Sequence, residues 1–238
     1  MKIYFDLDDT LYSQYVPFKK AYQQCFSFPV DIYCLYQLSR QYNNQNFIKA
    51  SHHEISFKQF YCQRIQVPLK QLGHDIDEQL AYKFQQCYQE NQKQIELIPE
   101  IKELLDILVL HVELGIITNG PKDKQQAKID ALHLEKWFLK ENIIISSKVH
   151  LEKPDQRIFD YANPQHETCL FIGDGYEIDI VGAKKAHWKT IWFNHKLEKQ
   201  KGKLADYIVL NAKDLKELVL KLLKTEFNIT ILHTFSIL

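Results

Sequence analysis

Two patterns of hydrophobic and polar residues divide the chain. Residues 14–95 are rich in Gln, Tyr and Phe and contain few runs of β-branched residues, which favours helices over strands. We expect four helices in succession, as in a bundle, with breaks near Pro29, residues 43–46 and residues 68–73. The expected helices cover residues 18–26, 31–42, 56–66 and 75–93.

From Pro99 onward, apolar runs alternate with amphipathic stretches. Apolar residues at 101, 104, 105 and 108 recur at i, i+3, i+4 and i+7, which predicts an amphipathic helix that begins near Pro99. Short apolar runs predict strands at residues 3–5, 114–118, 143–145, 169–172, 190–193 and 207–210. Four further helices are expected: one that follows Pro121 and ends near residue 131, one over 154–161, one that follows Asp174 and ends near residue 186, and one over 214–223. Asp214 can cap the last of them.

Apolar strands that alternate with helices indicate a parallel sheet covered on both faces, a Rossmann-like three-layer α/β/α arrangement. We therefore expect an α/β core made of residues 1–13 and 96–224, interrupted by a helical-bundle domain over residues 14–95. Apolar residues in the segment 225–238 recur with a period of two, which predicts a strand-like tail. Because the helical insertion comes just after the first strand, it is placed to cover a site at that strand end.

The first strand, Ile3 to Phe5, runs directly into Asp6, Asp8 and Asp9. Closely spaced carboxylates repel one another, so a folded chain holds them most easily beside a bound hard cation. Residues at i and i+2 of an extended segment point to the same side, which would let Asp6 and Asp8 share one site. For this motif alone a solvated acidic turn is the simpler interpretation, and the other strand ends decide between the two.

Polar residues follow other predicted strands as well. Thr118 and Asp174 lie at the ends of two of them, and Lys153 comes shortly after a third. Because the carboxyl ends of parallel strands meet at one edge of a sheet, we expect these groups to converge with Asp6 and Asp8. The set is what phosphoryl transfer through a carboxylate nucleophile requires.

Each of these groups has a role in such a reaction. Asp6 can attack phosphorus and, together with Asp174, hold Mg²⁺, which prefers few carboxylates plus water and phosphate oxygens. Lys153 supplies a fixed positive charge and Thr118 a hydrogen bond to the phosphoryl oxygens. Asp8 can protonate the leaving oxygen and later deprotonate water.

The chain resembles the haloacid dehalogenase (HAD) superfamily over about residues 1–224. Counterparts of the four motifs of that superfamily appear in order as Asp6-Leu7-Asp8-Asp9-Thr10, Ile117-Thr118-Asn119-Gly120, Lys153-Pro154 and Gly173-Asp174-Gly175-Tyr176-Glu177-Ile178-Asp179. The resemblance implies that Asp6 is the nucleophile and Asp8 the acid/base, and that Thr118, Asn119 and Lys153 bind phosphate. It also implies that Mg²⁺ is bound by Asp6, Asp174 and the backbone carbonyl of Asp8, with Asp179 in support.

The resemblance extends to organisation and activity. The helical insertion resembles a type I cap, which closes over the active site in the superfamily and contributes to substrate choice. With an aspartate at position 8 the chain resembles the phosphatases of the superfamily, because the dehalogenases proper lack an aspartate there. The expected activity is therefore Mg²⁺-dependent hydrolysis of a small phosphorylated metabolite. Segments 116–121 and 151–159 look most like the nucleotidase-like branch, which often takes nucleoside monophosphates.

Several alternatives stay open. A phosphomutase would pass the phosphoryl group to a second sugar hydroxyl instead of water, and a 2-haloacid dehalogenase-type hydrolase or a non-catalytic phosphate-binding protein would share the fold. The sequence also departs from the family pattern at His187, where glycine is usual after the motif-four helix, and this departure affects the helix end rather than the chemistry.

Composition limits the partners. Thirty basic and thirty acidic residues give a formal net charge of zero, which does not favour a nucleic acid polymer or an anionic membrane as partner. Five scattered cysteines without a CxxC pair argue against a disulfide framework or a zinc site. The opening residues carry no signal-peptide pattern, and no window approaches about 18 apolar residues, so we expect a cytoplasmic protein. The expected partner is a small phosphorylated substrate. Oligomeric state is not predicted.

Remaining polar and aromatic residues receive simpler interpretations. We interpret Asp9 as a turn residue, Asp123, Lys124 and Lys128 as a solvated helix face, and His52 and His53 as surface-loop residues. Most aromatic residues of the helical region are expected in the bundle core, with one or two able to stack on a substrate ring; among them are Tyr22, Phe26, Tyr33, Tyr36, Phe57, Phe60 and Tyr61. Calcium-binding EF-hand, P-loop and GxGxxG motifs are excluded by spacing.

Overall fold

The computed structural model describes residues 1–51, 54–199 and 202–227. The chain divides into two compact units. One unit contains residues 1–13 and the described residues from 96 onward, and the other contains residues 14–95. None of the helices in the described part of the chain has the length and apolar character needed to span a bilayer.

The first unit is built on a parallel sheet. In the described residues, six strands follow the order β3-β2-β1-β4-β5-β6. Their bounds are β1 (Lys2–Phe5), β2 (Glu113–Thr118), β3 (Ile143–Ile145), β4 (Cys169–Gly173), β5 (Lys189–Phe193) and β6 (Tyr207–Val209). Central strand β1 pairs with β2 and β4, so that Phe5 lies opposite both Ile116 and Ile172. The strand order reverses between β1 and β4, which is where open α/β sheets bind ligands.

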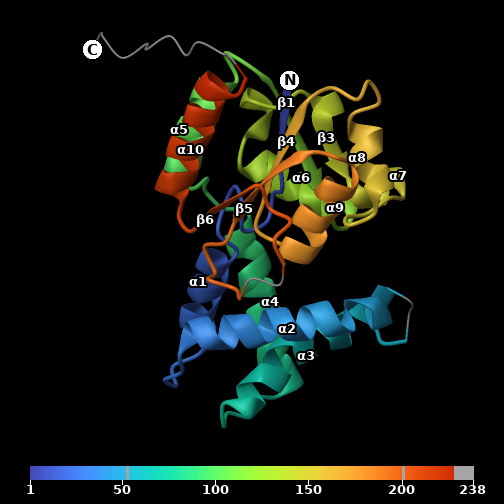
Figure 1. Cartoon of the computed structure of the whole chain (residues 1–238). Helices are drawn as coiled ribbons and strands as arrows, with labels where there is room; N and C mark the ends of the chain where they lie inside the picture. The colour runs from blue at the N-terminus through green and yellow to red at the C-terminus, as the bar shows by residue number, and fades with distance from the viewer. Residues whose placement is uncertain (52–53, 200–201, 228–238) are drawn as a thin grey trace. The chain divides into compact units, whose positions relative to one another are not determined.

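Helices cover both faces of this sheet. Helices α5 (Pro99–Leu108) and α10 (Ala212–Thr225) pack together on one face, and α8 (Gln156–Ala162) and α9 (Val181–Lys185) lie on the other (Figure 1). Beneath α8 and α9, the rings of Tyr4, Phe159, Phe171 and Trp188 form an aromatic core. The expected Rossmann-like α/β/α core is confirmed.

Shorter elements complete the first unit. Helix α6 (Lys122–Ala131) follows β2, and α7 (Ser146–Val149) follows β3. The 3-10 turns η1 (Leu134–Lys136) and η2 (Lys140–Asn142) lie between α6 and β3, and the wide π-helical turn η3 (Tyr176–Ile180) joins β4 to α9. The elements that follow β2 and β4 therefore begin beside the sheet edge where the predicted site residues lie.

The starts of α5 and α10 in this unit each have a local signal. The apolar stripe of α5 is completely buried, with Pro99 in the first turn as expected. The prediction that Asp214 caps the last helix was wrong. Asn211 is the cap, since its Oδ1 accepts a hydrogen bond from the Asp214 backbone N at 2.9 Å, which starts α10 at Ala212.

The second unit contains four helices among its described residues. They are α1 (Tyr15–Cys25), α2 (Ile32–Ser51), α3 (Phe57–Gln71) and α4 (Glu78–Gln92). Their shared core is largely aromatic and includes Phe18, Tyr22, Phe26, Tyr36, Phe84 and Tyr88. Phe60 is buried as expected, whereas Tyr33 and Phe57 are each 40% exposed.

One predicted break in this unit was wrong, and another lies later than the expected helix end. Helix α2 continues through residues 43–46, because asparagine lowers helix propensity only slightly and the Asn46 side chain bonds the Tyr42 carbonyl at 3.0 Å. The break predicted near residues 68–73 is present, but α3 runs past its expected end at residue 66, contains Pro68 and ends at Gln71. The chain then turns at Gly73, whose φ of 84° suits glycine.

Two predictions concern residues that the structure does not describe. The helix α10 extends to Thr225, and most of the strand-like segment predicted over 225–238 falls within residues 228–238, outside the described residues. His52 and His53 also lie outside them.

Candidate active site

The carboxyl ends of β1, β2 and β4 bring the predicted polar residues together. Lys153 is nearly inaccessible, with 1% of its side chain exposed, and its Nζ lies 2.7 Å from Asp6 Oδ1 and 2.6 Å from Asp179 Oδ1. Thr118 is also buried. The lysine therefore links the end of β1 to the turn that follows β4.

Three carboxylates form a compact cluster at this edge. Asp6, Asp174 and Asp179 each offer an oxygen within 4.8 Å of the others. Burial raises the pKa of each of these carboxyls to about 6, since water no longer stabilises the charge, and Lys153 and Lys196 oppose that rise. Hard oxygen donors at this spacing fit Mg²⁺, which would favour the ionised form of all three.

Asp179 is held in the cluster by the backbone around it. The Gly175 backbone N donates to Asp179 Oδ2 at 2.9 Å. The carboxylate also packs against Gly173, where an added Cβ would lie 2.5 Å from Asp179 Oδ2. Glycine at the end of β4 therefore allows the turn η3 to bring Asp179 up to Lys153.

Asp8 lies in a separate polar network. Lys128 Nζ is 2.7 Å from Asp8 Oδ1 and 2.9 Å from Oδ2, Gln125 Nε2 donates to Oδ2 at 3.1 Å, and the Tyr12 hydroxyl bonds Oδ1. Burial alone would raise the pKa of Asp8, but the Lys128 ammonium and these hydrogen bonds lower it to about 2. Asp8 is therefore strongly biased toward its ionised form.

Lys128 was wrongly interpreted as part of a solvated helix face. Its side chain is only 12% exposed because α6 turns it toward Asp8. Gln125, one turn earlier on α6, bonds both Asp8 and the Thr118 hydroxyl, and it accepts a hydrogen bond from Lys128 at 2.7 Å. The spacing of 125 and 128 places both on one helix face directly after a strand end, a signal that the sequence does contain.

Asn119 supports the site through the backbone. Its Nδ2 donates to the Lys153 carbonyl at 2.8 Å, and its Oδ1 accepts from the Lys153 backbone N at 3.0 Å. These two bonds fix the segment that carries Lys153. The side-chain amide that was expected to bind phosphate thus contacts the loop of another site residue.

A second lysine went unnoticed in the sequence. Lys196 Nζ lies 2.6 Å from Asp174 Oδ2 and 2.8 Å from Asp9 Oδ2. Asp9 lies in a turn with φ of 61°, as expected of a turn residue, yet it is only 2% exposed and its carboxylate is ion-paired. Lys196 follows β5, so the rule that located Asp6 and Asp174 would have found it too.

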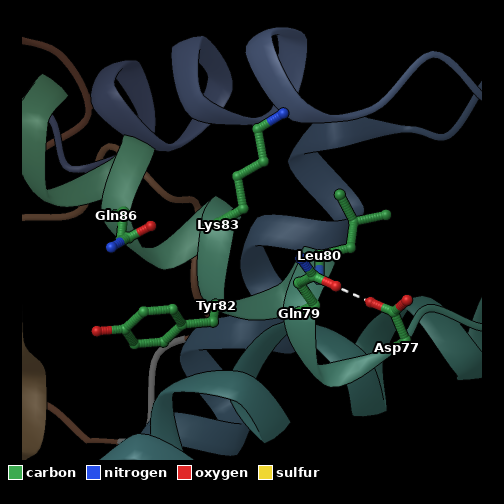
Figure 2. A pocket seen from close by; sticks show the side chains of 6 residues that line it. All are labelled: Asp77, Gln79, Leu80, Tyr82, Lys83 and Gln86. Carbon is green, nitrogen blue, oxygen red and sulfur yellow. Dashed lines mark hydrogen bonds between the residues drawn. The ribbon is translucent and has the colours of Figure 1, made fainter.

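The helical unit carries a groove of its own along α4. Figure 2 shows the residues that line it, which all belong to α4 or cap it: Asp77, Gln79, Leu80, Tyr82, Lys83 and Gln86. Asp77 accepts a hydrogen bond from the Leu80 backbone N at 2.7 Å, an ordinary helix cap. None of the predicted site residues lies there, so the edge of the sheet is the candidate active site.

Solved structures share this fold. A putative HAD-hydrolase, YfnB from Bacillus subtilis, bound to magnesium, is 21% identical with a TM-score of 0.68, and the match covers 92% of this chain and 97% of that one. A dehalogenase with an intermediate complex is 18% identical with a TM-score of 0.71, covering 91% and 96%. At these identities the likeness concerns the fold.

Curated relatives match over part of the chain. The Escherichia coli pyrimidine 5'-nucleotidase YjjG is 33% identical over 52% of this chain and 57% of its own length. A Pyrococcus furiosus glyceraldehyde 3-phosphate phosphatase is 34% identical over 44% and 46%. The mouse N-acylneuraminate-9-phosphatase is 34% identical over 41% of each chain. The chain thus spans about half the length of the curated relatives it matches.

A family model covers more of the sequence than these relatives do. The model described as haloacid dehalogenase-like hydrolase matches residues 3–193. That span includes the ends of β1, β2 and β4, Lys153 and the whole second unit. The chain belongs to the haloacid dehalogenase-like hydrolase family.

Proposed function

We propose that the protein is a Mg²⁺-dependent phosphatase that hydrolyses a small phosphorylated metabolite through a phosphoaspartyl intermediate. The arrangement around Asp6 carries this proposal. Its carboxylate ends the central strand, contacts Lys153 at 2.7 Å, and lies within 4.8 Å of carboxylate oxygens of Asp174 and Asp179. A nucleophile, a fixed cation and a set of metal ligands thereby meet at one point.

In the first step an Asp6 oxygen attacks phosphorus, and the bond from phosphorus to the leaving oxygen breaks. In the second step water attacks the aspartyl phosphate, releases inorganic phosphate and restores Asp6. The leaving oxygen gains a proton in the first step and water loses one in the second. Asp8 is ionised and has no proton of its own to donate. We therefore assign both transfers to the hydrogen-bonded pair of Asp8 and Lys128.

Other groups handle the charge of the substrate. Lys153 lies against Asp6 and offsets the repulsion between the Asp6 carboxylate and the phosphate group of the substrate. Thr118 accepts a hydrogen bond from Gln125, which leaves its own hydroxyl hydrogen to donate to a phosphoryl oxygen. Mg²⁺, held by Asp6, Asp174 and the Asp8 backbone carbonyl with Asp179 in support, would neutralise the remaining phosphoryl charge.

The names of the curated relatives guide the choice of substrate. They describe a pyrimidine 5'-nucleotidase, a glyceraldehyde 3-phosphate phosphatase and an N-acylneuraminate-9-phosphatase. Small phosphate monoesters are common to these names. Nucleoside monophosphates are the first class to test, since the segments around Thr118 and Lys153 look most like the nucleotidase-like branch.

Release of inorganic phosphate tests the proposal. The full chain is assayed with Mg²⁺ against an aryl phosphate, nucleoside monophosphates and triose and sugar phosphates. We expect turnover that is lost on chelation, and Asp6→Asn to lower kcat by about a thousandfold or more. Asp123→Asn, at an exposed position of α6, is the matched control and should retain activity. Absence of phosphate release from every substrate, or an active Asp6→Asn variant, would refute the proposal.

The same assay separates the alternatives. A phosphomutase would transfer the group to a second sugar hydroxyl, so steady release of phosphate into solution argues against it. A dehalogenase-type hydrolase would release halide from a 2-haloacid, and we expect none, because the proton-carrying Asp8 is present and paired with Lys128.

A further inference from the structure

The turn after β5 is built to hold one lysine at the acidic edge of the sheet. Asn194 closes the turn through two side-chain bonds, from its Nδ2 to the Glu198 carbonyl at 2.9 Å and from the Glu198 backbone N to its Oδ1 at 2.8 Å. The Asn194 backbone N also bonds the Val209 carbonyl at 2.8 Å, which fixes the turn to β6. Lys196 projects from this closed turn.

Neighbouring contacts align the turn with β1 and β4. His195 Nε2 lies 2.8 Å from the Asp9 carbonyl, and Trp192 Nε1 donates to the Asp174 carbonyl at 2.8 Å. Lys196 is thereby placed between two carboxylates, with 22% of its side chain exposed against 2% for Asp9 and 14% for Asp174. This position is fixed by the fold and does not depend on a flexible surface side chain.

The charges of the site are nearly balanced without a metal. Ion pairs connect the aspartates at 6, 8, 9, 174 and 179 with the lysines at 128, 153 and 196. Five carboxylates and three ammonium groups leave a formal charge of −2, which one Mg²⁺ neutralises. Any change to a member of this set alters the charge that the metal meets.

We propose that Lys196 and Asp9 form a charge-setting pair that determines how tightly the acidic site holds Mg²⁺. The proposal rests on the proposed function, whose metal it concerns. Lys196 contributes a positive charge in direct contact with the metal-ligating Asp174, and Asp9 offsets part of it. Neither residue is required to touch the metal or the substrate, so each acts on the metal only through its charge.

The charge-setting role makes predictions of opposite sign for the two residues. A unit charge about 5 Å from a divalent ion changes its affinity about tenfold even when water screens it fully, and more in a buried site. Lys196→Met should therefore tighten Mg²⁺ binding about tenfold or more. Asp9→Asn should weaken it by a similar factor. If the pair only held Asp174 in place, both variants would weaken binding.

Calorimetric titration of the full chain with MgCl₂ measures this directly. The titration is run at low salt and pH 8, where the carboxyl pKa values of about 6 leave the cluster ionised. Asparagine tolerates the left-handed φ of 61° at position 9, so Asp9→Asn changes charge with little change in shape. Weaker binding by Lys196→Met, or unchanged binding by both variants, would overturn the proposal.

Three further variants complete the experiment. Lys196→Arg keeps the charge and should bind Mg²⁺ like the unmodified chain. Lys184→Met removes a lysine that pairs with Asp206, which bonds Thr190 near the start of β5, whereas Lys196 follows the end of that strand; this variant should leave the affinity within about twofold. The double variant of Asp9→Asn with Lys196→Met restores the net charge and should return the affinity toward the starting value. If Lys196→Met alone does not fold, comparison of the double variant with Asp9→Asn still measures the effect of removing the lysine charge.

The outcome separates this inference from the proposed function. Lack of Mg²⁺ binding by the unmodified chain would count against the metal-dependent phosphatase itself. Normal binding and turnover with an unchanged affinity in the single variants would overturn only the role given to Lys196 and Asp9.

Discussion

The contact with Lys128 is the largest of the interactions that keep Asp8, the proposed proton carrier, ionised. Lys128 is 12% exposed and Asp8 20%, and the ammonium lies within 3 Å of both carboxylate oxygens. An anion left in such a place without its cation is poorly solvated. The contact therefore stabilises the fold as well as the ionised form of Asp8.

Lys128→Met should lower the free energy of unfolding. Breaking a fully buried ion pair costs about 3–5 kcal/mol, so the partial exposure of this pair leads us to expect about 1–3 kcal/mol. Urea unfolding at neutral pH measures the loss. Lys122→Met, at an exposed position of the same helix, should change the free energy by less than about 0.5 kcal/mol. Equal stability of the two variants would show that the contact contributes nothing.

A second prediction concerns His187, which stands where the family usually has glycine. At the end of helix α9, the Trp188 backbone N donates to the Ala183 carbonyl at 3.0 Å, and the His187 backbone N donates to the Lys184 carbonyl at 3.0 Å. This pattern needs a left-handed residue after the cap, and His187 has φ of 62°. The helix thus keeps its usual ending despite the histidine, at the expense of backbone strain.

His187→Gly should raise the free energy of unfolding by about 0.5–1 kcal/mol, because relief of the strain exceeds the entropy that glycine loses. His187→Ala keeps the strain and is the matched control, with no gain expected. His187 is exposed, so lost contacts should not obscure the comparison. Thermal or urea unfolding of both variants decides the matter, and a stabilised alanine variant would contradict the explanation.

Among the elements, Asp206 ties α9 and β5 to the segment that enters β6. Its carboxylate accepts from Lys184 Nζ at 3.0 Å, from the Thr190 backbone N at 2.8 Å and from the Thr190 hydroxyl at 2.9 Å. Burial alone would raise the pKa of Asp206, but these donors lower it below the ordinary value. The unfolded chain thus binds this proton more readily than the folded chain.

Stability from Asp206 should therefore depend on pH in a defined direction. A folded pKa below the unfolded value of about 3.9 gives a contribution that is fully present above about pH 4 and lost as the pH falls through the folded pKa. The difference in unfolding free energy between the unmodified chain and Asp206→Asn should be constant from about pH 5 to 8 and shrink below about 4. Urea titrations across this range test it, and a difference that persists undiminished at pH 3 would contradict it.

Elements and site residues differed in how well the sequence predicted them. Strands β1, β2 and β4 were clear because strands buried on both faces appear as continuous apolar runs, and their ends located Asp6, Thr118 and Asp174. Helix α2 was cut short because polar residues were taken as a break, although tertiary packing decides helix length.

Side-chain partnerships were harder to predict than strand ends. Lys128 was interpreted as a surface lysine and Lys196 was not noticed, because the sequence does not state which way a helix face or a turn points. Charge offered a physical signal: the three aspartates that follow β1, and the two after β4, need cations close by even before a metal binds. Searching the other strand ends for lysine would have found Lys196, though not its two partners.

At the scale of the whole molecule, the second unit, residues 14–95, has the features of an independent domain. It has its own aromatic core on α1 to α4, while the first unit has a separate core around Phe159 and Phe171. We propose that the two units unfold as separate domains. The three tryptophans, Trp137, Trp188 and Trp192, all belong to the first unit, so their fluorescence reports on that unit alone.

Mg²⁺ should then stabilise one transition and leave the other unchanged. The carboxylates at 6, 174 and 179 all belong to the first unit, and a ligand that binds the folded state stabilises it by about 2.7 kcal/mol at a hundred times its Kd. In urea, the midpoint of the transition followed by tryptophan fluorescence should move to a higher urea concentration when Mg²⁺ is added. The helical signal of circular dichroism should then show two transitions, and the midpoint of the second unit's transition should not move. Coincident curves with both probes, shifted together by Mg²⁺, would mean that the two units unfold as one.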